Sequence, residues 1–327
     1  MTSGRILGQS GLEISPIMLG GNVFGWTADE RTSFDILDAF VDHGFNAIDT
    51  SDAYSAWVPG HEGGESECMI GRWIRDRGRR HAVMLATKVG ARPLAPERAT
   101  RHGDWAPDLS AQYIIESVDR SLRRLNTDHI DLYQAHVDDE ATPFDETLEA
   151  FGRLVRDGKV RAIGASNISP DRLRKALAAS ESASLPRYES CQPCFNLLDR
   201  DQVATGLQSL CVDRQVGMLC YSALAKGFLT GRYRSRAAAE GTEWERFLQA
   251  YFNERGDRAL ALLDEIASEH RTSPGRVALA WLLAQPAVTA AIVAVNSVEE
   301  LEEVLGCTQV VLDERQLRDL TSVAAAP

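Results

Sequence analysis

The chain has 327 residues, of which 44% are hydrophobic and 25% are charged, and its formal net charge is −12. This length and composition are ordinary for a globular protein with a sizeable core, and a single α/β domain over residues 1–327 accounts for them. The acidic balance argues against a general affinity for nucleic acid or anionic membranes, because the overall field repels phosphate groups.

The first segment of the chain, MTSGRILGQSGLEIS, has no apolar core of the signal-peptide kind, which predicts a cytoplasmic protein. Within it, RILGQSGLEIS alternates around a glycine-containing turn and predicts a hairpin that plugs the N-terminal end of a barrel. The most apolar stretch, Val277–Val295, is cut by Gln285-Pro286. It therefore predicts a buried helix followed by a buried strand, and not a membrane span.

Apolar runs and amphipathic segments alternate along the rest of the chain. The apolar runs predict strands near residues 14–20, 46–50, 83–88, 130–135, 160–165, 188–194, 216–221 and 289–294. The amphipathic segments predict helices near residues 30–43, 64–77, 110–124, 144–156, 170–180, 201–213, 258–270 and 297–305. Ser273-Pro274 begins a further helix near 274–284. Eight strands that are each followed by a helix indicate βαβ units and a parallel (β/α)8 TIM barrel.

Three connections are longer than is usual, and each follows a predicted strand. They are Ala53–Glu65, Gly90–Leu109 and Lys226–Asp257. Loops after barrel strands lie at the C-terminal face, where these would carry the aromatic residues Trp57, Trp105, Trp244, Phe247, Tyr251 and Phe252. The aromatics suggest an apolar substrate cleft, and packing of the loops on the barrel rim explains any one of them equally well.

One C-x-x-C spacing, Cys191 to Cys194, is shared with redox and zinc motifs. No second pair completes a zinc site, and the surrounding YESCQPCF is strand-like, so that residues three apart face opposite sides. Buried free thiols are the favoured interpretation.

Three of the strand-like runs end in polar residues that suggest chemistry. NAIDTSDAY supplies Asp49 and Tyr54, VMLATKV supplies Lys88, and IDLYQAH ends on His136. Because the C-terminal ends of parallel barrel strands meet at one face, these four side chains are expected to converge. Each alone has an ordinary explanation, as a turn cap, a surface cation, a rim aromatic or a core histidine. Together they favour a catalytic site.

The chemistry expected of this group is acid catalysis by a phenol. Tyrosine has a pKa of about 10, and a nearby lysine ammonium lowers that pKa by favouring phenolate. A buried lysine in turn needs a carboxylate to remain charged. Asp49, Lys88 and Tyr54 satisfy this logic, and His136 would orient a carbonyl oxygen or share the proton transfer.

These motifs make the sequence resemble the aldo-keto reductase family. The resemblance covers nearly the whole chain through GFNAIDTSDAY (Gly44–Tyr54), GESECMIGRWI (Gly64–Ile74), LATKVG (Leu85–Gly90), IDLYQAHVDD (Ile130–Asp139), GKVRAIGASNIS (Gly158–Ser169), CQPCFNLLDR (Cys191–Arg200) and CYSALAKGFLTGRY (Cys220–Tyr233). It implies an eight-stranded β/α barrel. It also implies hydride transfer between a nicotinamide cofactor and a small-molecule carbonyl, with Tyr54 as the general acid.

The resemblance also assigns a cofactor site. Ser166 and Asn167 would bind the nicotinamide carboxamide with Gln192 beside them, and Tyr221 would stack on the ring. The backbone lining the pyrophosphate would come from Ser222, Leu224, Lys226 and Gly227. No GxGxxG is present, because Gly20-Gly21-Asn22-Val23-Phe24-Gly25 has the wrong spacing, and Gly21 and Asn22 are expected to approach the nicotinamide instead.

The adenosine end departs from the family pattern in VAVNSVEELEEVLG (Val293–Gly306), where Asn296 and Glu300 would lie. Glu300 stands where the family usually has Arg or Gln. A carboxylate would repel a ribose 2′-phosphate but could accept a hydrogen bond from a 2′-hydroxyl. NADP(H) is kept slightly ahead on family grounds, with NAD(H) as the contender.

Two other functions remain open from the sequence. One is a redox-sensing or regulatory subunit of the same fold that binds the cofactor with little catalysis. The other is a metal-dependent barrel hydrolase that uses His61, Glu62 and His136 as ligands, although no second histidine lies at helical ligand spacing. No pattern indicates an oligomeric state.

Overall fold

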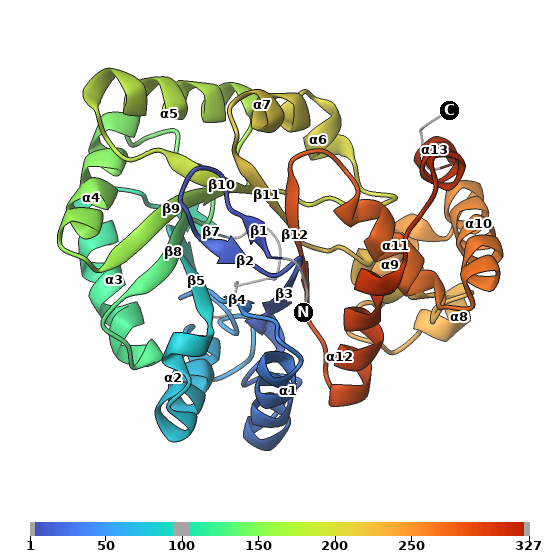
Figure 1. Cartoon of the computed structure of the whole chain (residues 1–327). Helices are drawn as coiled ribbons and strands as arrows, with labels where there is room; N and C mark the ends of the chain where they lie inside the picture. Colours follow the sequence, from blue (N-terminus) through green and yellow to red (C-terminus); the bar gives the residue numbers. More distant parts are fainter. Residues whose placement is uncertain (1–3, 94–104, 324–327) are drawn as a thin grey trace.

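The structure is a computed structural model that describes residues 4–93 and 105–323. Within these residues, eight parallel strands form a closed barrel that the helices surround (Figure 1). The strands are β3 (Ile17–Gly20), β4 (Ala47–Asp49), β5 (Met84–Val89), β8 (Ile130–Ala135), β9 (Val160–Ser166), β10 (Tyr188–Gln192), β11 (Gly217–Cys220) and β12 (Val288–Val293). The ring closes where β12 pairs with β3, with Ala291 opposite Ile17. The predicted α/β barrel and all its predicted strands are confirmed.

The predicted helices are present around this barrel. They are α1 (Glu30–Asp42), α2 (Glu65–Arg77), α3 (Ala111–Leu125), α4 (Phe144–Arg156), α5 (Pro170–Ala183), α6 (Asp201–Ala204), α7 (Leu207–Asp213), α10 (Glu254–His270), α11 (Pro274–Leu283) and α12 (Val298–Leu305). Ser169 and Ser273 cap α5 and α11 by accepting hydrogen bonds from the N–H groups of Arg172 and Arg276.

Three helix expectations need correction. The single helix predicted over 201–213 is broken into α6 and α7, because Gly206 takes a φ of +99° that a helix cannot contain. Helix α10 begins at Glu254, earlier than predicted, since Asn253 accepts hydrogen bonds from the N–H groups of Arg255 and Gly256. A further helix, α13 (Glu314–Val323), was not predicted.

The N-terminal hairpin closes one end of the barrel as predicted. Strands β1 (Arg5–Ile6) and β2 (Glu13–Ile14) pair antiparallel. Leu7, Leu12 and Ile14 are buried in one cluster with inward-facing residues of the barrel, which are Met18, Ala47, Met84, Ala86, Leu132, Ala162, Leu219, Ala290 and Ile292. These residues fill the N-terminal part of the barrel interior, so that the C-terminal part is left for polar side chains.

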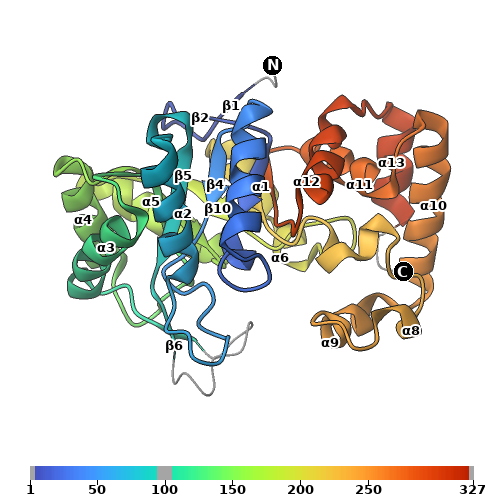
Figure 2. The ribbon, with the colours of Figure 1, turned by 90° about the horizontal axis from the view of Figure 1, so that it is seen from below.

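The long loops lie on the opposite side of the barrel from the hairpin (Figure 2). The second of them carries the antiparallel pair β6 (Ala91–Pro93) and β7 (Trp105–Pro107), and residues 94–104 lie outside the described part. The third contains α8 (Arg236–Ala239), α9 (Glu245–Leu248) and the short helix η4 (Gln249–Tyr251). Loop placement on the face at the C-terminal ends of the strands agrees with the sequence expectation.

Two further observations on the described residues concern membrane spans and cysteines. None of their helices has the length and apolar character needed to cross a membrane. All six cysteines are free thiols, and Cys191 of the C-x-x-C spacing is buried while Cys194 is partly exposed.

Candidate active site

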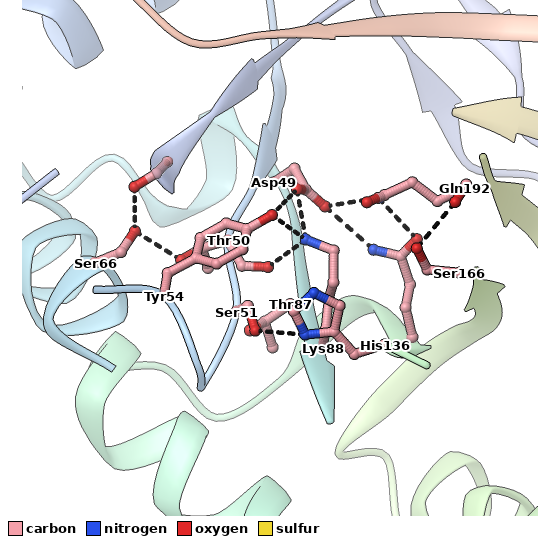
Figure 3. A network of polar contacts seen from close by, with 12 residues as sticks. Asp49, Thr50, Ser51, Tyr54, Ser66, Thr87, Lys88, His136, Ser166 and Gln192 are labelled. Carbon is pink, nitrogen blue, oxygen red and sulfur yellow. Dashed lines mark hydrogen bonds and ion pairs between the residues drawn. The ribbon is translucent and has the colours of Figure 1, made fainter. Parts of the chain in front are cut away.

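A polar layer caps the apolar interior of the barrel. Residues two apart on a strand face the same side, so the inward positions of β5 run from Met84 through Ala86 to Lys88. On four of the other strands the same alternation ends in a polar side chain, giving Asp49 on β4, Gln134 on β8, Ser166 on β9 and Gln192 on β10. This register brings side chains from distant parts of the chain into one network (Figure 3).

Asp49, Lys88 and Tyr54 are in direct contact, as the sequence predicted. Lys88 Nζ donates to Asp49 Oδ2 over 2.6 Å and to Tyr54 Oη over 2.8 Å. The Tyr54 hydroxyl donates to the same Asp49 oxygen over 3.2 Å. The phenol therefore lies against both the ammonium and the carboxylate.

Asp49 is held through its second oxygen as well. Its Oδ1 accepts hydrogen bonds from Gln192 Nε2 at 3.0 Å and from Gln134 Nε2 at 3.2 Å. Gln134 was missed from the sequence. Its place in an apolar strand, two residues before His136 and hence on the same face, was the available signal. Four donors on one carboxylate leave Asp49 little freedom to move away from Lys88.

Lys88 is fully buried with every ammonium proton used. Its third hydrogen bond goes to the carbonyl of Thr50 at 2.9 Å. Burial lowers the pKa of Lys88, while the Asp49 carboxylate acts in the opposite direction. Three acceptors, one of them anionic, match the three protons of an ammonium, so we assign the charged form.

The pKa expected for Tyr54 is corrected by the structure. Burial and the adjacent Asp49 carboxylate raise the pKa of this phenol well above its ordinary value, whereas the sequence argument had Lys88 lower it. Asp49 accepts a hydrogen bond from the phenol and repels a phenolate, an effect opposite to that of the Lys88 ammonium. Tyr54 is consequently a protonated phenol in the resting site.

His136 follows β8 and lies edge-on to Tyr54, with ring centroids 5.9 Å apart. Burial and the Lys88 ammonium lower the pKa of His136 well below its ordinary value, so its imidazole is neutral. Its Nδ1 contacts Ser51 Oγ at 3.1 Å. Its Nε2 forms no hydrogen bond with the residues described, which leaves that nitrogen available to a ligand.

The predicted nicotinamide-binding residues form a second hydrogen-bonded row. Tyr221 donates its hydroxyl proton to Asn167 Oδ1 at 2.9 Å, and Asn167 Nδ2 donates to the His136 carbonyl at 3.0 Å. Ser166 Oγ donates to the Gln192 carbonyl at 2.9 Å. The Gln192 amide nitrogen, however, is turned to Asp49 and Gln134. Gln192 therefore lies beside Ser166 and also holds the Asp49 carboxylate.

The loop predicted to line the pyrophosphate has an unusual backbone. Ser222, Lys226 and Gly227 all have positive φ angles, of 55°, 57° and 87°. Successive residues of this kind form concave arrangements of N–H groups that suit an anion. The Gly227 N–H itself donates to the Leu224 carbonyl at 3.0 Å within the loop. The Lys226 ammonium lies 5.5 Å from the Phe247 ring centroid.

Gly21 and Asn22 lie after β3 in the short helix η1 (Gly21–Val23). The Gly21 carbonyl accepts a hydrogen bond from Ser66 Oγ at 2.6 Å. A Cβ at Gly21 would approach Ser66 Oγ to 2.8 Å, so the glycine is needed for the packing of α2 at this point. Asn22 is partly exposed, and its side chain makes no hydrogen bond to the described residues.

Asn296 and Glu300 lie together at the start of α12. Glu300 Oε2 accepts from the Asn296 N–H at 2.9 Å, and Glu300 Oε1 accepts from Arg232 at 2.5 Å. Although burial acts to raise the pKa of Glu300, these hydrogen bonds lower it, so the carboxylate is ionised. Arg232 is a cation that the sequence interpretation missed. Its position in the GRY segment just after the predicted pyrophosphate loop was the signal.

Aromatic rings extend outward from Tyr54. The Trp57 ring is 6.1 Å from Tyr54 and 5.7 Å from Trp26, measured between ring centroids. Trp57 comes from the first long loop, and Trp26 was not singled out from the sequence. Such rings beside the phenol support an apolar substrate cleft.

The metal-site hypothesis lacks a suitable cluster. Among residues 4–93 and 105–323, no three His, Cys, Asp or Glu side chains are grouped so that they could hold a metal ion. His61, Glu62 and His136 all fall within these ranges, and they do not form such a group.

Comparison with known proteins gives consistent matches. The model of a family described as the aldo/keto reductase family matches residues 16–325. The uncharacterized oxidoreductase YrpG of Bacillus subtilis is 36% identical, over 98% of this chain and 95% of that protein. The aldo-keto reductase yakc [NADP(+)] of Schizosaccharomyces pombe is 31% identical, over 90% and 82% of the two chains. The L-glyceraldehyde 3-phosphate reductase of Escherichia coli (strain K12) is 30% identical, over 91% and 85%.

Proposed function

Since the chain belongs to the aldo/keto reductase family and is an NAD(P)H-dependent oxidoreductase, we propose that it interconverts an aldehyde or ketone and the corresponding alcohol, with Tyr54 as the general acid. The observation that carries the proposal is the contact of Tyr54 Oη with Lys88 Nζ at 2.8 Å, with Lys88 itself bound to Asp49. A bound reduced nicotinamide would supply the hydride for this reaction.

The raised pKa of Tyr54 is compatible with an acid role. A phenol that stays protonated at neutral pH holds its proton until a carbonyl oxygen gains negative charge. As the proton leaves, the Lys88 ammonium is already in place to stabilise the developing phenolate. Lys88 therefore contributes more in the transition state than in the resting site, and this difference is what accelerates a reaction.

The remaining residues suit binding and orientation. Asn167 and Tyr221 are held to each other and to the His136 carbonyl, so the face they present is ordered before a ligand arrives. The positive-φ loop around Ser222 and Lys226 offers a backbone site for a pyrophosphate without a Rossmann glycine motif. These features support binding of a nicotinamide dinucleotide at the C-terminal face.

We keep NADP(H) ahead of NAD(H) as the cofactor. Arg232 supplies the cation that a ribose 2′-phosphate needs, and it lies directly on Glu300. The Glu300 carboxylate is thus partly neutralised and repels a phosphate less than the sequence alone suggested. The name of the similar Schizosaccharomyces pombe protein includes NADP(+), which indicates that cofactor for the relative.

Replacement of Tyr54 by Phe tests the proposed mechanism. We expect kcat for carbonyl reduction to fall by at least about 100-fold, because no proton donor remains beside Lys88. Cofactor affinity, measured by quenching of tryptophan fluorescence, should change little because the phenol acts mainly in the transition state.

Tyr133→Phe is a matched control for this experiment. Tyr133 is fully buried on β8 and its hydroxyl makes no hydrogen bond to the described residues, so the same atom is removed outside the contacts of Tyr54, Lys88 and Asp49. Turnover that survives in Tyr54→Phe would refute the role of the phenol. Tight cofactor binding without turnover of any carbonyl by the unmodified protein would instead favour the regulatory-subunit alternative.

A further inference from the structure

A second hydrogen-bonded chain leads away from His136 on the side opposite the ligand-accessible nitrogen. Ser51 Oγ lies 3.1 Å from His136 Nδ1 and 3.3 Å from Asp52 Oδ1. The same Ser51 oxygen accepts a hydrogen bond from the Ala53 N–H at 3.1 Å. The Ser51–His136 contact is visible in Figure 3. Ser51 is fully buried and Asp52 is partly buried.

A serine hydroxyl has a single proton, so the chain has one arrangement in which that proton faces Asp52 and one in which it faces His136. The Ala53 N–H already occupies one acceptor position of Ser51 Oγ. If Asp52 is ionised, Ser51 donates to Asp52 and must accept from a proton on His136 Nδ1. If Asp52 is protonated and its carboxyl proton faces Ser51, Asp52 donates to Ser51, and Ser51 then donates to an unprotonated His136 Nδ1.

The two arrangements place opposite chemistry on His136 Nε2. In the neutral imidazole a proton on Nδ1 leaves Nε2 as a hydrogen-bond acceptor, and an unprotonated Nδ1 makes Nε2 a donor. The first arrangement is reached from the second by three proton transfers. His136 Nε2 releases one proton to solvent, Ser51 passes its proton to His136 Nδ1, and Asp52 passes its proton to Ser51. The chain as a whole then holds one proton fewer.

We propose that Asp52, acting through Ser51, is a positioning residue that sets the tautomer of His136. A protonated Asp52 makes Nε2 a donor suited to a carbonyl oxygen, and an ionised Asp52 makes Nε2 an acceptor suited to an alcohol hydroxyl. The effect on reaction direction rests on the proposed function, whereas the tautomer change itself does not.

The surroundings of Asp52 allow this change near neutral pH. Burial, together with the Glu67 carboxylate, raises the pKa of Asp52 to about 7, and Arg124 and Arg120 act in the opposite direction. Glu67 is itself bound by Arg124 at 2.6 Å and by the Thr87 hydroxyl at 2.6 Å. Among the described residues, Lys88, Tyr113 and Tyr133 are also coupled electrostatically to Asp52.

His136 itself does not titrate across this range. Burial and the Lys88 ammonium keep its pKa well below the ordinary value, so the ring is neutral on both sides of pH 7. The direction of the tautomer change with pH follows from this. Below pH 7 Asp52 is protonated, and His136 Nε2 carries the ring proton. Above pH 7 Asp52 is ionised, and the proton is on Nδ1.

Nitrogen NMR of the protein labelled with 15N-histidine measures the tautomer without substrate or cofactor. We expect the Nε2 signal of His136, assigned by its absence in His136→Gln, to change from a protonated to an unprotonated shift between pH 5.5 and 8.5. In Asp52→Asn and in Ser51→Ala the midpoint should disappear. Asp138→Asn should retain it, because that residue lies two positions from His136 but is bound by Arg172 and not by Ser51.

A single His136 tautomer throughout the pH range in the unmodified protein would overturn the proposal. A tautomer change with a midpoint near pH 7 that persists in Asp52→Asn would also overturn the proposal. A midpoint that persists in Ser51→Ala would exclude the relay through the Ser51 hydroxyl. As a kinetic readout, the ratio of kcat for reduction to kcat for oxidation, each at saturating substrate and cofactor, should fall roughly tenfold more between pH 6 and pH 8 in the unmodified protein than in a variant with a fixed histidine tautomer. This additional fall should be lost in Asp52→Asn. An inactive protein that still shows the tautomer change would contradict the proposed function alone.

Discussion

At the scale of single residues, the adenosine end of the proposed cofactor site depends on one pair of opposite charges. Arg232 and Glu300 are joined over 2.5 Å, and both side chains are partly exposed. A ribose 2′-phosphate would compete with Glu300 for the guanidinium, whereas a 2′-hydroxyl could bind Glu300 directly. If the proposed cofactor site is right, cofactor preference is a balance between these two groups.

Replacing Glu300 by Gln should shift that balance toward NADPH. The change removes one negative charge and frees Arg232, so we expect the ratio of kcat/KM for NADPH to that for NADH to rise roughly fivefold, or about 1 kcal/mol for a partly exposed charge. Steady-state kinetics with both cofactors measure this ratio. Glu299→Gln removes the same charge from the exposed side of α12 and should leave the ratio unchanged. An unchanged ratio in both variants would place the 2′-phosphate elsewhere.

At the scale of elements, the hairpin and the long loops divide the barrel into an end for stability and an end for chemistry. The hairpin inserts Leu7, Leu12 and Ile14 beneath the strands, and the polar layer with Asp49 and Lys88 lies above them. Leu7 contacts the barrel at Gly217, where an added Cβ would come within 2.8 Å of the leucine side chain. This separation predicts that the hairpin affects folding more than catalysis.

Leu7→Ala tests that division. Removing a fully buried leucine side chain should lower the free energy of unfolding by about 3 kcal/mol, since transfer energy is lost and a cavity remains. Urea unfolding followed by circular dichroism gives this value, and kcat of the folded variant should be unaltered. Ile6→Ala is the control, because Ile6 is 55% exposed and its loss should change stability by less than about 0.5 kcal/mol. Equal decreases in the free energy of unfolding in the two variants would show that the N-terminal hairpin is not packed against the barrel.

At the scale of the whole molecule, the dependence of stability on pH follows from the many carboxylates. Asp131, at the start of β8, is 2% exposed and accepts hydrogen bonds from Arg80 at 2.7 Å, Arg161 at 2.7 Å and the Leu85 N–H at 2.9 Å. Burial acts to raise the pKa of Asp131, but these partners lower it below its ordinary value. A carboxyl with a lower pKa in the folded than in the unfolded chain stabilises the fold fully above the unfolded pKa of about 3.9. That contribution is lost as the pH falls through the folded pKa.

Asp131→Asn should therefore destabilise the protein at pH 7 by about 2 kcal/mol, because two arginines lose their shared carboxylate. The difference from the unmodified protein should shrink as the pH falls below ~3.9, where both chains lack this charge. Urea unfolding at pH 7 and at successively lower pH values measures the trend. Asp213→Asn, at an exposed position near the end of α7, should differ little from the unmodified protein at any pH. A difference for Asp131→Asn that grows toward acid pH would contradict the assigned sign.

The arrangement of the barrel was predictable because the information is local. Period-two apolar runs, serine caps before Pro170 and Pro274, and strand-end positions for Asp49, Lys88 and His136 can all be recognised within a few neighbouring residues. The family resemblance rests on the same short segments. Glycine conformation was a partial exception, since Gly206 broke a helix that composition alone would continue.

Contacts between groups far apart in the chain were decided only by the tertiary structure. Gln192 reaches Asp49 across 143 residues and Gln134 does so across 85, and both depend on the register and closure of the barrel. The protonated state of Tyr54, the Arg232–Glu300 pair and the Ser51–Asp52 chain behind His136 likewise depend on burial and distance. Side-chain alternation shows which face a residue occupies. Electrostatics depends on what lies opposite that residue, and the closed barrel alone sets this.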